Sequence, residues 1–184
     1  MPRYHPTAND YAMAWLRIAV GLLFLIFAQY KIFGREFIYQ GGFENWIHQF
    51  LSGQAYPFMV PFLRDFVLRH ASVISIILSY GELCIGVCLL LGIAVRLASF
   101  FGFAYMSMLI LASNYPGLHA PWWEYVGASL NHLVLALCFL AFGMANSARA
   151  WSLASFLDRK YGPRRKAPAD EFVVQPRSGN IFNK

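Results

Sequence analysis

The chain has 184 residues, of which 58% are hydrophobic and 13% charged. Its mean hydropathy is +0.46. A soluble domain carries about 25% charged residues, and a protein of this size has too much surface to hide so apolar a chain from water. The composition therefore excludes an ordinary soluble domain and predicts a protein that uses the lipid bilayer as its solvent.

The net charge is +6, and much of the basic excess lies near the C-terminus, in Arg159-Lys160 and Arg164-Arg165-Lys166. A basic patch of this size could suggest nucleic acid in a soluble protein. A short basic run that follows an apolar stretch is more typical of an anchor at anionic lipid headgroups. We therefore expect lipid, and no nucleic acid, as the partner of this charge.

Four stretches have about the 20 mostly apolar residues that a membrane-spanning helix needs. They cover residues 11–33, 71–93, 96–115 and 125–145. The first is too long for the apolar core of a signal peptide, so we expect it to remain in the protein. Short links join the last three, which must be antiparallel neighbours. The predicted fold class is all-α, an integral membrane four-helix up-down bundle over residues 1–158, followed by a basic cytoplasmic tail over residues 159–184.

The distribution of Lys and Arg predicts the orientation of this bundle. With both termini on the inner side, ten basic residues flank the spans there and four flank them outside. Because basic residues are retained on the cytoplasmic side, we expect a multi-pass protein of the cell inner (cytoplasmic) membrane with both termini in the cytoplasm.

The first loop, residues 34–70, is too interrupted by Gly and Pro for a span but is rich in aromatic residues. One apolar stripe at helical spacing comprises Phe43, Trp46, Ile47, Phe50 and Leu51, and a second comprises Phe58, Phe62 and Phe66. Such stripes favour amphipathic helices. We expect two short helices that lie in the outer membrane interface.

Polar residues inside the predicted spans are the candidate functional groups, because burying them in lipid is costly. They are Arg17, Gln29 and Lys31 in the first span, Tyr80 and Glu82 in the second, and Asn131 and His132 in the fourth. At about 1.5 Å per residue, Glu82 lies near mid-membrane and Lys31 lies almost at the outer surface. We expect Arg17 and Glu82 to form a charge-assisted pair, with His132 and Gln29 above them.

Two interpretations of this cluster stay open from the residues alone. One is that the polar groups only fix how the helices pack. The other is a proton-accessible pocket for a small redox molecule such as a quinone, with hydrogen bonds from His132, Glu82 and Tyr80, and with the aromatic loop covering an entrance from the lipid. We expect no metal site and no covalent cofactor, since buried cysteines such as Cys84 and Cys88 are usually apolar filler.

Several short motifs resemble the DoxX/DoxD family. They are Leu16-Arg17, Gly21-Leu22, Phe24 and Lys31 in the first span, Gly81-Glu82-Leu83, Gly86 and Leu89-Leu90-Leu91-Gly92 in the second, Arg96-Leu97-Ala98 after the turn, and Ala148-Arg149-Ala150-Trp151-Ser152-Leu153 with Asp158 near the end. The resemblance covers about residues 12–158. It implies a four-helix membrane protein and adds Arg96 to Arg17, Lys31 and Glu82 as site residues. The chain departs from the family at Ala28-Gln29-Tyr30, where a Gly-containing turn is more usual.

The name-giving members of that family are subunits of thiosulfate:quinone oxidoreductase. The resemblance therefore implies a redox-associated membrane subunit that handles quinone in electron transfer from thiosulfate or another donor, together with other membrane-protein subunits. The alternative is a non-catalytic accessory or structural subunit of a larger respiratory or photosynthetic membrane complex.

Overall fold

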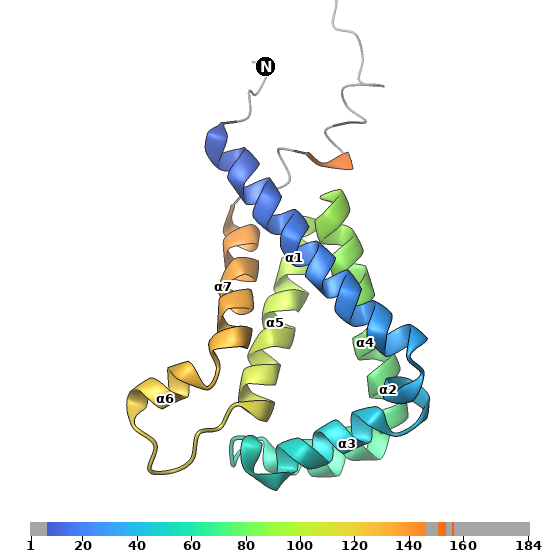
Figure 1. Cartoon of the computed structure of the whole chain (residues 1–184), viewed down its shortest axis with the longest axis vertical. Coiled ribbons are helices and arrows are strands. Elements are labelled where there is room, and N and C mark those ends of the chain that lie inside the picture. The colour runs from blue at the N-terminus through green and yellow to red at the C-terminus, as the bar shows by residue number, and fades with distance from the viewer. Residues whose placement is uncertain (1–6, 146–150, 154–155, 157–184) are drawn as a thin grey trace, which may run out of the picture.

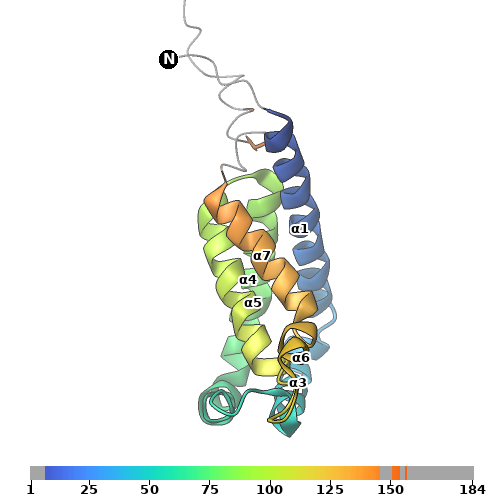
Figure 2. The same ribbon diagram turned by 90° about the vertical axis from the view of Figure 1, so that its left-hand side faces the viewer.

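The computed structural model describes residues 7–145, 151–153 and 156. These residues form helices and turns without a strand, which confirms the predicted all-α class. Four helices run along the molecule, and shorter helices close one end (Figures 1 and 2). The four are α1 (Ala8–Phe33), α4 (Ala71–Leu91), α5 (Val95–Ser113) and α7 (Leu130–Met144). The predicted tail over residues 159–184 lies outside the described residues.

Three of the helical stretches are long enough and apolar enough to cross a membrane. They are α1, α5, and the continuous helical stretch Phe62–Leu91 that ends with α4. Each begins and ends close to a predicted span, apart from the extra turns that precede α4. The remaining long helix, α7, is apolar but has only 15 residues.

The prediction that residues 125–145 form one continuous span was wrong. The structure divides it into α6 (Trp122–Gly127) and α7, with a turn at Ala128 and Ser129. At this turn the side-chain amide of Asn114 donates a hydrogen bond to the Ala128 carbonyl, at 2.5 Å. The contact ties the end of α5 to the start of α7, and hydropathy cannot predict it because it comes from a distant polar side chain.

The first loop folds into short helical segments at the end of the molecule opposite the N-terminus of α1 (Figure 1). We call this end the outer end, and the end at which α1 begins the inner end. The segments are α2 (Glu36–Tyr39), α3 (Gly42–Gln49), the π-helical turns η1 (Phe50–Gln54) and η2 (Phe62–Val67), and the 3₁₀ turn η3 (Leu68–His70). Of these segments, α3 lies across the helix ends (Figure 2), whereas η2 and η3 run directly into α4.

The two aromatic stripes of this loop have different surroundings. In the first stripe Phe43, Ile47 and Phe50 are buried, as expected for one face of an amphipathic helix. In the second stripe all three phenylalanines are at least 40% exposed, and the buried side chains of that segment are Leu63 and Val67. The second stripe is therefore more exposed than the first, and the best-buried side chains of η2 lie next to it. Phe62 and Phe66 nevertheless line a cavity between the loop and the long helices.

The long helices form two closely packed pairs, α1 with α4 and α5 with α7, which are joined mainly through α4 and α5. Glycine allows both close contacts. A Cβ atom at Gly21 would lie 3.1 Å from the Gly86 carbonyl oxygen of α4, and a Cβ atom at Gly102 would overlap the Phe139 ring of α7. Small residues permit this approach of helix backbones in membranes, where packing replaces the hydrophobic effect between helices.

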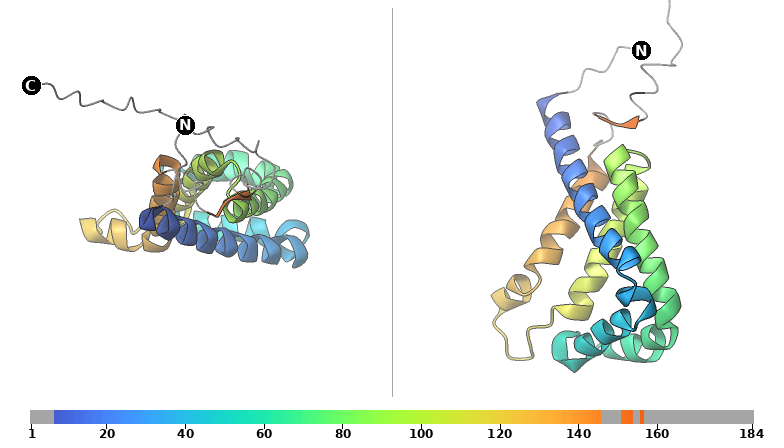
Figure 3. Two further views of the ribbon diagram at one scale, coloured as in Figure 1. Left: turned by 90° about the horizontal axis from the view of Figure 1, so that it is seen from above. Right: turned by 45° about the vertical axis from the view of Figure 1, so that its right-hand side comes forward.

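The pairing leaves α1 and α7 in contact only toward the inner end. There the rings of Phe24 and Phe139 meet edge to face, with centroids 5.1 Å apart. From that contact α1 runs obliquely across the other long helices, and it diverges from α7 toward the outer end (Figures 1 and 3).

The buried side chains form two separate clusters. The inner cluster lies among the long helices and comprises Val20, Phe24, Ile85, Leu89, Val95, Ala98, Met106, Ala136, Phe139 and Phe142. The outer cluster lies between the loop helices and the ends of α4 and α5, and comprises Phe37, Phe43, Ile47, Phe50, Ala55, Leu63, Val67, Ala71 and Ala112. In the region between them, Lys31, Glu82, Tyr105 and His132 come together.

The contact of Gly102 with Phe139 can be tested by substitution. We expect Gly102→Ala to destabilise the protein by about 1–3 kcal/mol, because the added methyl group overpacks against a buried ring. Gly81→Ala is the matched control, since nothing lies within 4 Å of a Cβ atom there. Alanine is also the better helix former by about 1 kcal/mol. Thermal unfolding in detergent should show a lower midpoint for Gly102→Ala only; equal midpoints for the two variants would contradict the described packing.

Candidate functional site

A cavity of about 550 Å³ separates the inner cluster from the outer cluster. Its wall receives side chains from α1, α4, α5 and α7 and from the loop helices α2, α3, η1 and η2. Most of the wall is aromatic or aliphatic. The polar side chains on it are Lys31, Glu82, Tyr105, Ser113, Asn131 and His132.

Three of these polar side chains form a compact buried group. The Lys31 ammonium and the Tyr105 hydroxyl each donate to Glu82 Oε1, at 2.5 Å, and Lys31 Nζ lies 3.3 Å from the Tyr105 hydroxyl. The side chains of Glu82 and Lys31 are only 6% and 15% exposed. The three residues come from α4, α1 and α5, so this group links both helix pairs.

The second oxygen of the same carboxylate has no partner. Glu82 Oε2 is buried and accepts no hydrogen bond from any part of the chain that the structure describes. A buried polar atom without a partner is uncommon and calls for a donor from outside the chain, such as a water molecule or a ligand. One carboxylate oxygen is therefore paired twice, and the other is buried without a partner among the described residues.

The direction of helical side chains explains why Lys31 reaches Glu82. Lys31 lies in the last turn of α1, close to the outer end. Because a helical side chain leans toward the N-terminus of its own helix, the ammonium of Lys31 is directed back into the molecule. It also lies over the Phe37 ring, 4.9 Å from the centroid, an arrangement that favours a cation.

His132 approaches the cavity from α7, and its orientation is fixed by Asn114 at the end of α5. The Asn114 amide nitrogen donates to the Ala128 carbonyl, so its oxygen Oδ1 is the atom that faces His132 Nδ1, at 2.8 Å. An amide oxygen only accepts, and Nδ1 must therefore carry the proton. In the neutral imidazole this leaves Nε2 with a free lone pair.

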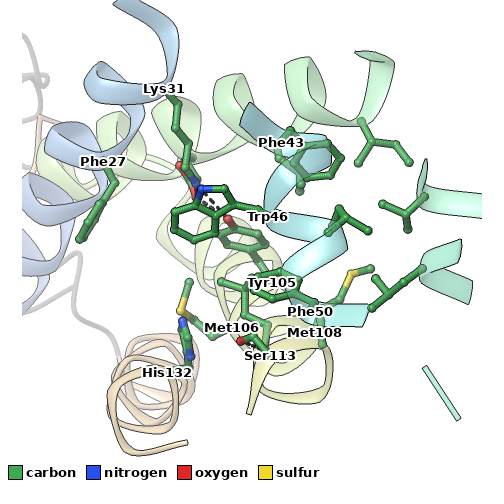
Figure 4. A pocket seen from close by; sticks show the side chains of 18 of the residues that line it. Phe27, Lys31, Phe43, Trp46, Phe50, Tyr105, Met106, Met108, Ser113 and His132 are labelled. Atoms are coloured by element: carbon green, nitrogen blue, oxygen red, sulfur yellow. Dashed lines mark hydrogen bonds and ion pairs between the residues drawn. The ribbon is translucent and has the colours of Figure 1, made fainter. Parts of the chain in front are cut away.

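The loop supplies an aromatic wall for the cavity (Figure 4). Phe37 packs against Phe43 and Trp46, and Trp46 packs against Phe50, all edge to face with centroids 5.5–6.5 Å apart. Such geometry is favourable between aromatic rings. In the close-up view, Trp46 lies across the cavity from Phe27 of α1 and His132 of α7.

The structure brings four of the eight candidate residues to the cavity, namely Lys31, Glu82, Asn131 and His132. Gln29 and Tyr80 are exposed and do not line it. Each is two positions from a residue that does, and two positions are about 200° apart on a helix. Arg96 is exposed near the start of α5, at the inner end.

The predicted pair between Arg17 and Glu82 was wrong. Arg17 is fully buried, but it donates to the Trp151 carbonyl at 2.8 Å, and its guanidinium lies against Gly92 where α4 ends. It therefore connects the inner end of α1 with the segment around Trp151. The depth estimate from residue counting placed Arg17 too close to Glu82, because it treated α1 as upright and ignored the direction of side chains.

Three polar site residues were missing from the candidates, namely Tyr105, Ser113 and Asn114. Tyr105 is a hydroxyl-bearing side chain in the middle of an apolar helix, and this alone could have identified it. Asn114 lies at the end of a predicted span, where polar residues are ordinary, so no sequence signal distinguishes it. Among the described residues, no group of three His, Cys, Asp or Glu side chains could hold a metal ion, and the three cysteines are unpaired.

The ion pair can be tested by a double-mutant cycle. We expect Lys31→Met to destabilise the protein by about 3 kcal/mol, because it leaves the Glu82 carboxylate buried without its cation. The double variant Lys31→Met/Glu82→Gln should regain most of that loss. Unfolding of the four proteins in detergent gives the coupling energy.

The exposed pair of Arg64 and Asp65 provides the control for this cycle. Arg64→Met should leave stability almost unchanged, since surface ion pairs contribute little. Additive effects of Lys31→Met and Glu82→Gln would contradict the described pairing.

Comparison with known proteins agrees with this architecture. No curated protein and no solved structure matches the chain. The model of the DoxX family matches residues 12–115, more than half of the chain. This match covers α1, the loop helices, α4 and α5, and so includes Lys31, Glu82 and Tyr105. The chain belongs to the DoxX family of membrane proteins.

Proposed function

We propose that this chain is a redox-associated membrane subunit whose cavity binds a quinone or a molecule of that class. The observation that supports the proposal most directly is the cavity itself. Small-molecule sites are typically mostly apolar pockets of about 300–1,000 Å³ with a few convergent polar groups. The cavity of about 550 Å³ has these properties, with the Glu82 group on α4 and His132 on α7.

The chemistry of the wall suits a flat ring that bears oxygen atoms. Aromatic side chains such as Phe43, Trp46 and Phe50 give such a ring apolar surfaces to contact. Glu82 and His132 are groups that exchange protons, which a quinone needs when it is reduced or oxidised. An aliphatic metabolite would use neither the aromatic wall nor these groups together.

We propose that the cavity opens to the bilayer between α1 and α7. The two helices touch at Phe24 and Phe139, and beyond this contact they diverge. Phe27 on α1 and Asn131 on α7 both line the cavity and are both exposed. A ligand dissolved in lipid would therefore enter from the side, beneath the aromatic loop.

We propose a four-span topology in the cell inner membrane, with the inner end in the cytoplasm. A helix of 15 residues such as α7 is about 22 Å long, less than the bilayer core of about 30 Å. The short α6 and the turn at Ala128 would complete this crossing. In this topology α3 and its neighbours lie at the outer interface, and the positive-inside distribution of the sequence is satisfied.

The electron donor would be a partner protein or a soluble substrate, and thiosulfate is the first donor to test. The support for this choice is family membership, because the name-giving relatives are subunits of thiosulfate:quinone oxidoreductase. The alternative, a non-catalytic accessory subunit, predicts that the cavity holds only ordinary lipid.

Binding of a short-chain quinone analogue tests the proposal. The purified full-length chain should bind the analogue, and quenching of tryptophan fluorescence should report it, since Trp46 lines the cavity. We expect Leu135→Trp to weaken binding at least tenfold by filling the cavity. Leu137→Trp is the matched control on the same helix, since Leu137 is 54% exposed and does not line the cavity.

Quenching that is absent, or equally strong in the two variants, would refute a quinone site in this cavity. Either result would favour the alternative, a non-catalytic accessory subunit. Calorimetric titration of the same proteins separates binding from collisional quenching in the detergent.

A further inference from the structure

Gln29 on α1 and Tyr80 on α4 are polar side chains on the outside of two helical stretches that are apolar enough to span a membrane. Both are exposed, and neither forms a hydrogen bond with the part of the chain that the structure describes. Tyr80 lies about 16 Å along α4 from the inner end of that helix at Leu91, which is about half the thickness of the bilayer core. Lipid tails offer no partner to a hydroxyl or an amide, so leaving these groups in hydrocarbon is costly.

The packing of α1 against α4 places these two side chains at one depth. The helices run side by side in opposite directions (Figure 3). They approach most closely at Gly21, where a Cβ atom would lie 3.0 Å from the Leu90 nitrogen and 3.1 Å from the Gly86 carbonyl oxygen. At about 1.5 Å per residue, Gln29 lies about 12 Å from this contact toward the outer end. Tyr80 lies about 9–15 Å from the same contact in the same direction.

Helix geometry also places both side chains on one flank of the helix pair. At about 100° per residue, Gln29 is turned about 80° from Gly21, and Tyr80 is turned about 120° in the same sense from Gly86. Because α1 and α4 are antiparallel, turns of the same sense lead to the same side of the pair. Lys31 is turned about 80° from Gly21 in the opposite sense, and it lines the cavity. The flank that carries Gln29 and Tyr80 therefore lies away from the cavity.

We infer that this flank binds a second copy of the chain. We call it the dimer face, and its exposed residues are Leu22 and Gln29 on α1 and Ile76, Tyr80 and Val87 on α4. A two-fold axis along the membrane normal keeps every residue at its depth, because both copies insert in the same orientation. It places α1 of each copy against α4 of the other. Gln29 of each copy then meets Tyr80 of the other, as an isologous interface requires.

The chemistry of the dimer face matches that of its own copy. A hydroxyl and a primary amide each donate and accept hydrogen bonds, so Gln29 and Tyr80 can satisfy one another. The remaining side chains of the face are apolar and pack equally well against their own kind. The dimer face shares no residue with the cavity wall, and the side of the cavity between α1 and α7 stays free. The inference therefore does not depend on which ligand the cavity binds.

The expected strength of the pairing follows from its symmetry. One hydrogen bond between membrane helices changes an association constant by roughly a factor of three. The two-fold axis generates two such bonds in each dimer. A substitution at either position removes both bonds, so we expect it to weaken dimerisation by about tenfold.

Energy transfer between full-length chains in lipid vesicles tests this inference. Chains labelled with a donor or an acceptor dye at the N-terminal amine are mixed, and the ratio of protein to lipid is varied to give the dimerisation constant. We expect a reversible dimer that Tyr80→Phe and Gln29→Leu each weaken by about tenfold. The double variant should be no weaker than either single variant, because the same two bonds are lost. Tyr80→Phe removes only a hydroxyl group that makes no contact within the described chain, so its folding should be unaffected.

Tyr30→Phe is the matched control. It also removes an exposed hydroxyl group from α1, but Tyr30 is turned about 180° from Gly21 and so lies on the side away from α4. Its dimerisation constant should equal that of the unmodified protein. A chain that is monomeric at every protein-to-lipid ratio overturns the inference. So does a dimer that is unchanged in Tyr80→Phe and Gln29→Leu, or that Tyr30→Phe weakens equally.

Discussion

The structure depends on one electrostatic constraint, a carboxylate placed deep in an apolar helix. Glu82 lies between glycine and leucine near the middle of α4, with only 6% of its side chain exposed. A buried charge is tolerated only when it is paired and hydrogen-bonded. Lys31 and Tyr105 satisfy one oxygen from two different helices. These contacts hold α1, α4 and α5 together at a point where no apolar contact could replace them without removing the charge.

The same constraint explains why the interior is divided. The close contacts made through glycine lie at the inner cluster, where Gly21 brings α1 against α4 and Gly102 brings α5 against α7. Beyond Glu82 the helices separate, and the loop helices supply the second cluster from the outer end. The cavity occupies the region between the two, so its polar groups lie at the boundary of the apolar clusters.

Much of the helical framework could be predicted from hydropathy, because long apolar stretches have few alternatives in a bilayer. The ends of α1, α4 and α5 lie within three residues of the predicted spans. The partner of Glu82 could not be found in this way. The pairing of Glu82 with Lys31 depends on the tilt of α1 and on the direction of the Lys31 side chain toward the N-terminus of its helix. Residue spacing predicts neither of these. The inclusion of Tyr80 in the predicted pocket was avoidable, because a residue two positions from Glu82 lies about 200° away around the helix. Tyr80 is exposed and does not line the cavity.

The central claim is that the space beside Glu82 holds a quinone-class molecule, and the most direct measurement is what the native protein retains. The full chain, purified in mild detergent from the membranes in which it functions, can be extracted with organic solvent and its quinone content quantified by chromatography and mass spectrometry. We expect close to one quinone or quinol per chain, and a ratio of quinone to co-purified lipid well above the ratio in the bulk membrane. Quinone present only in the proportion found in the bulk membrane lipid would contradict it.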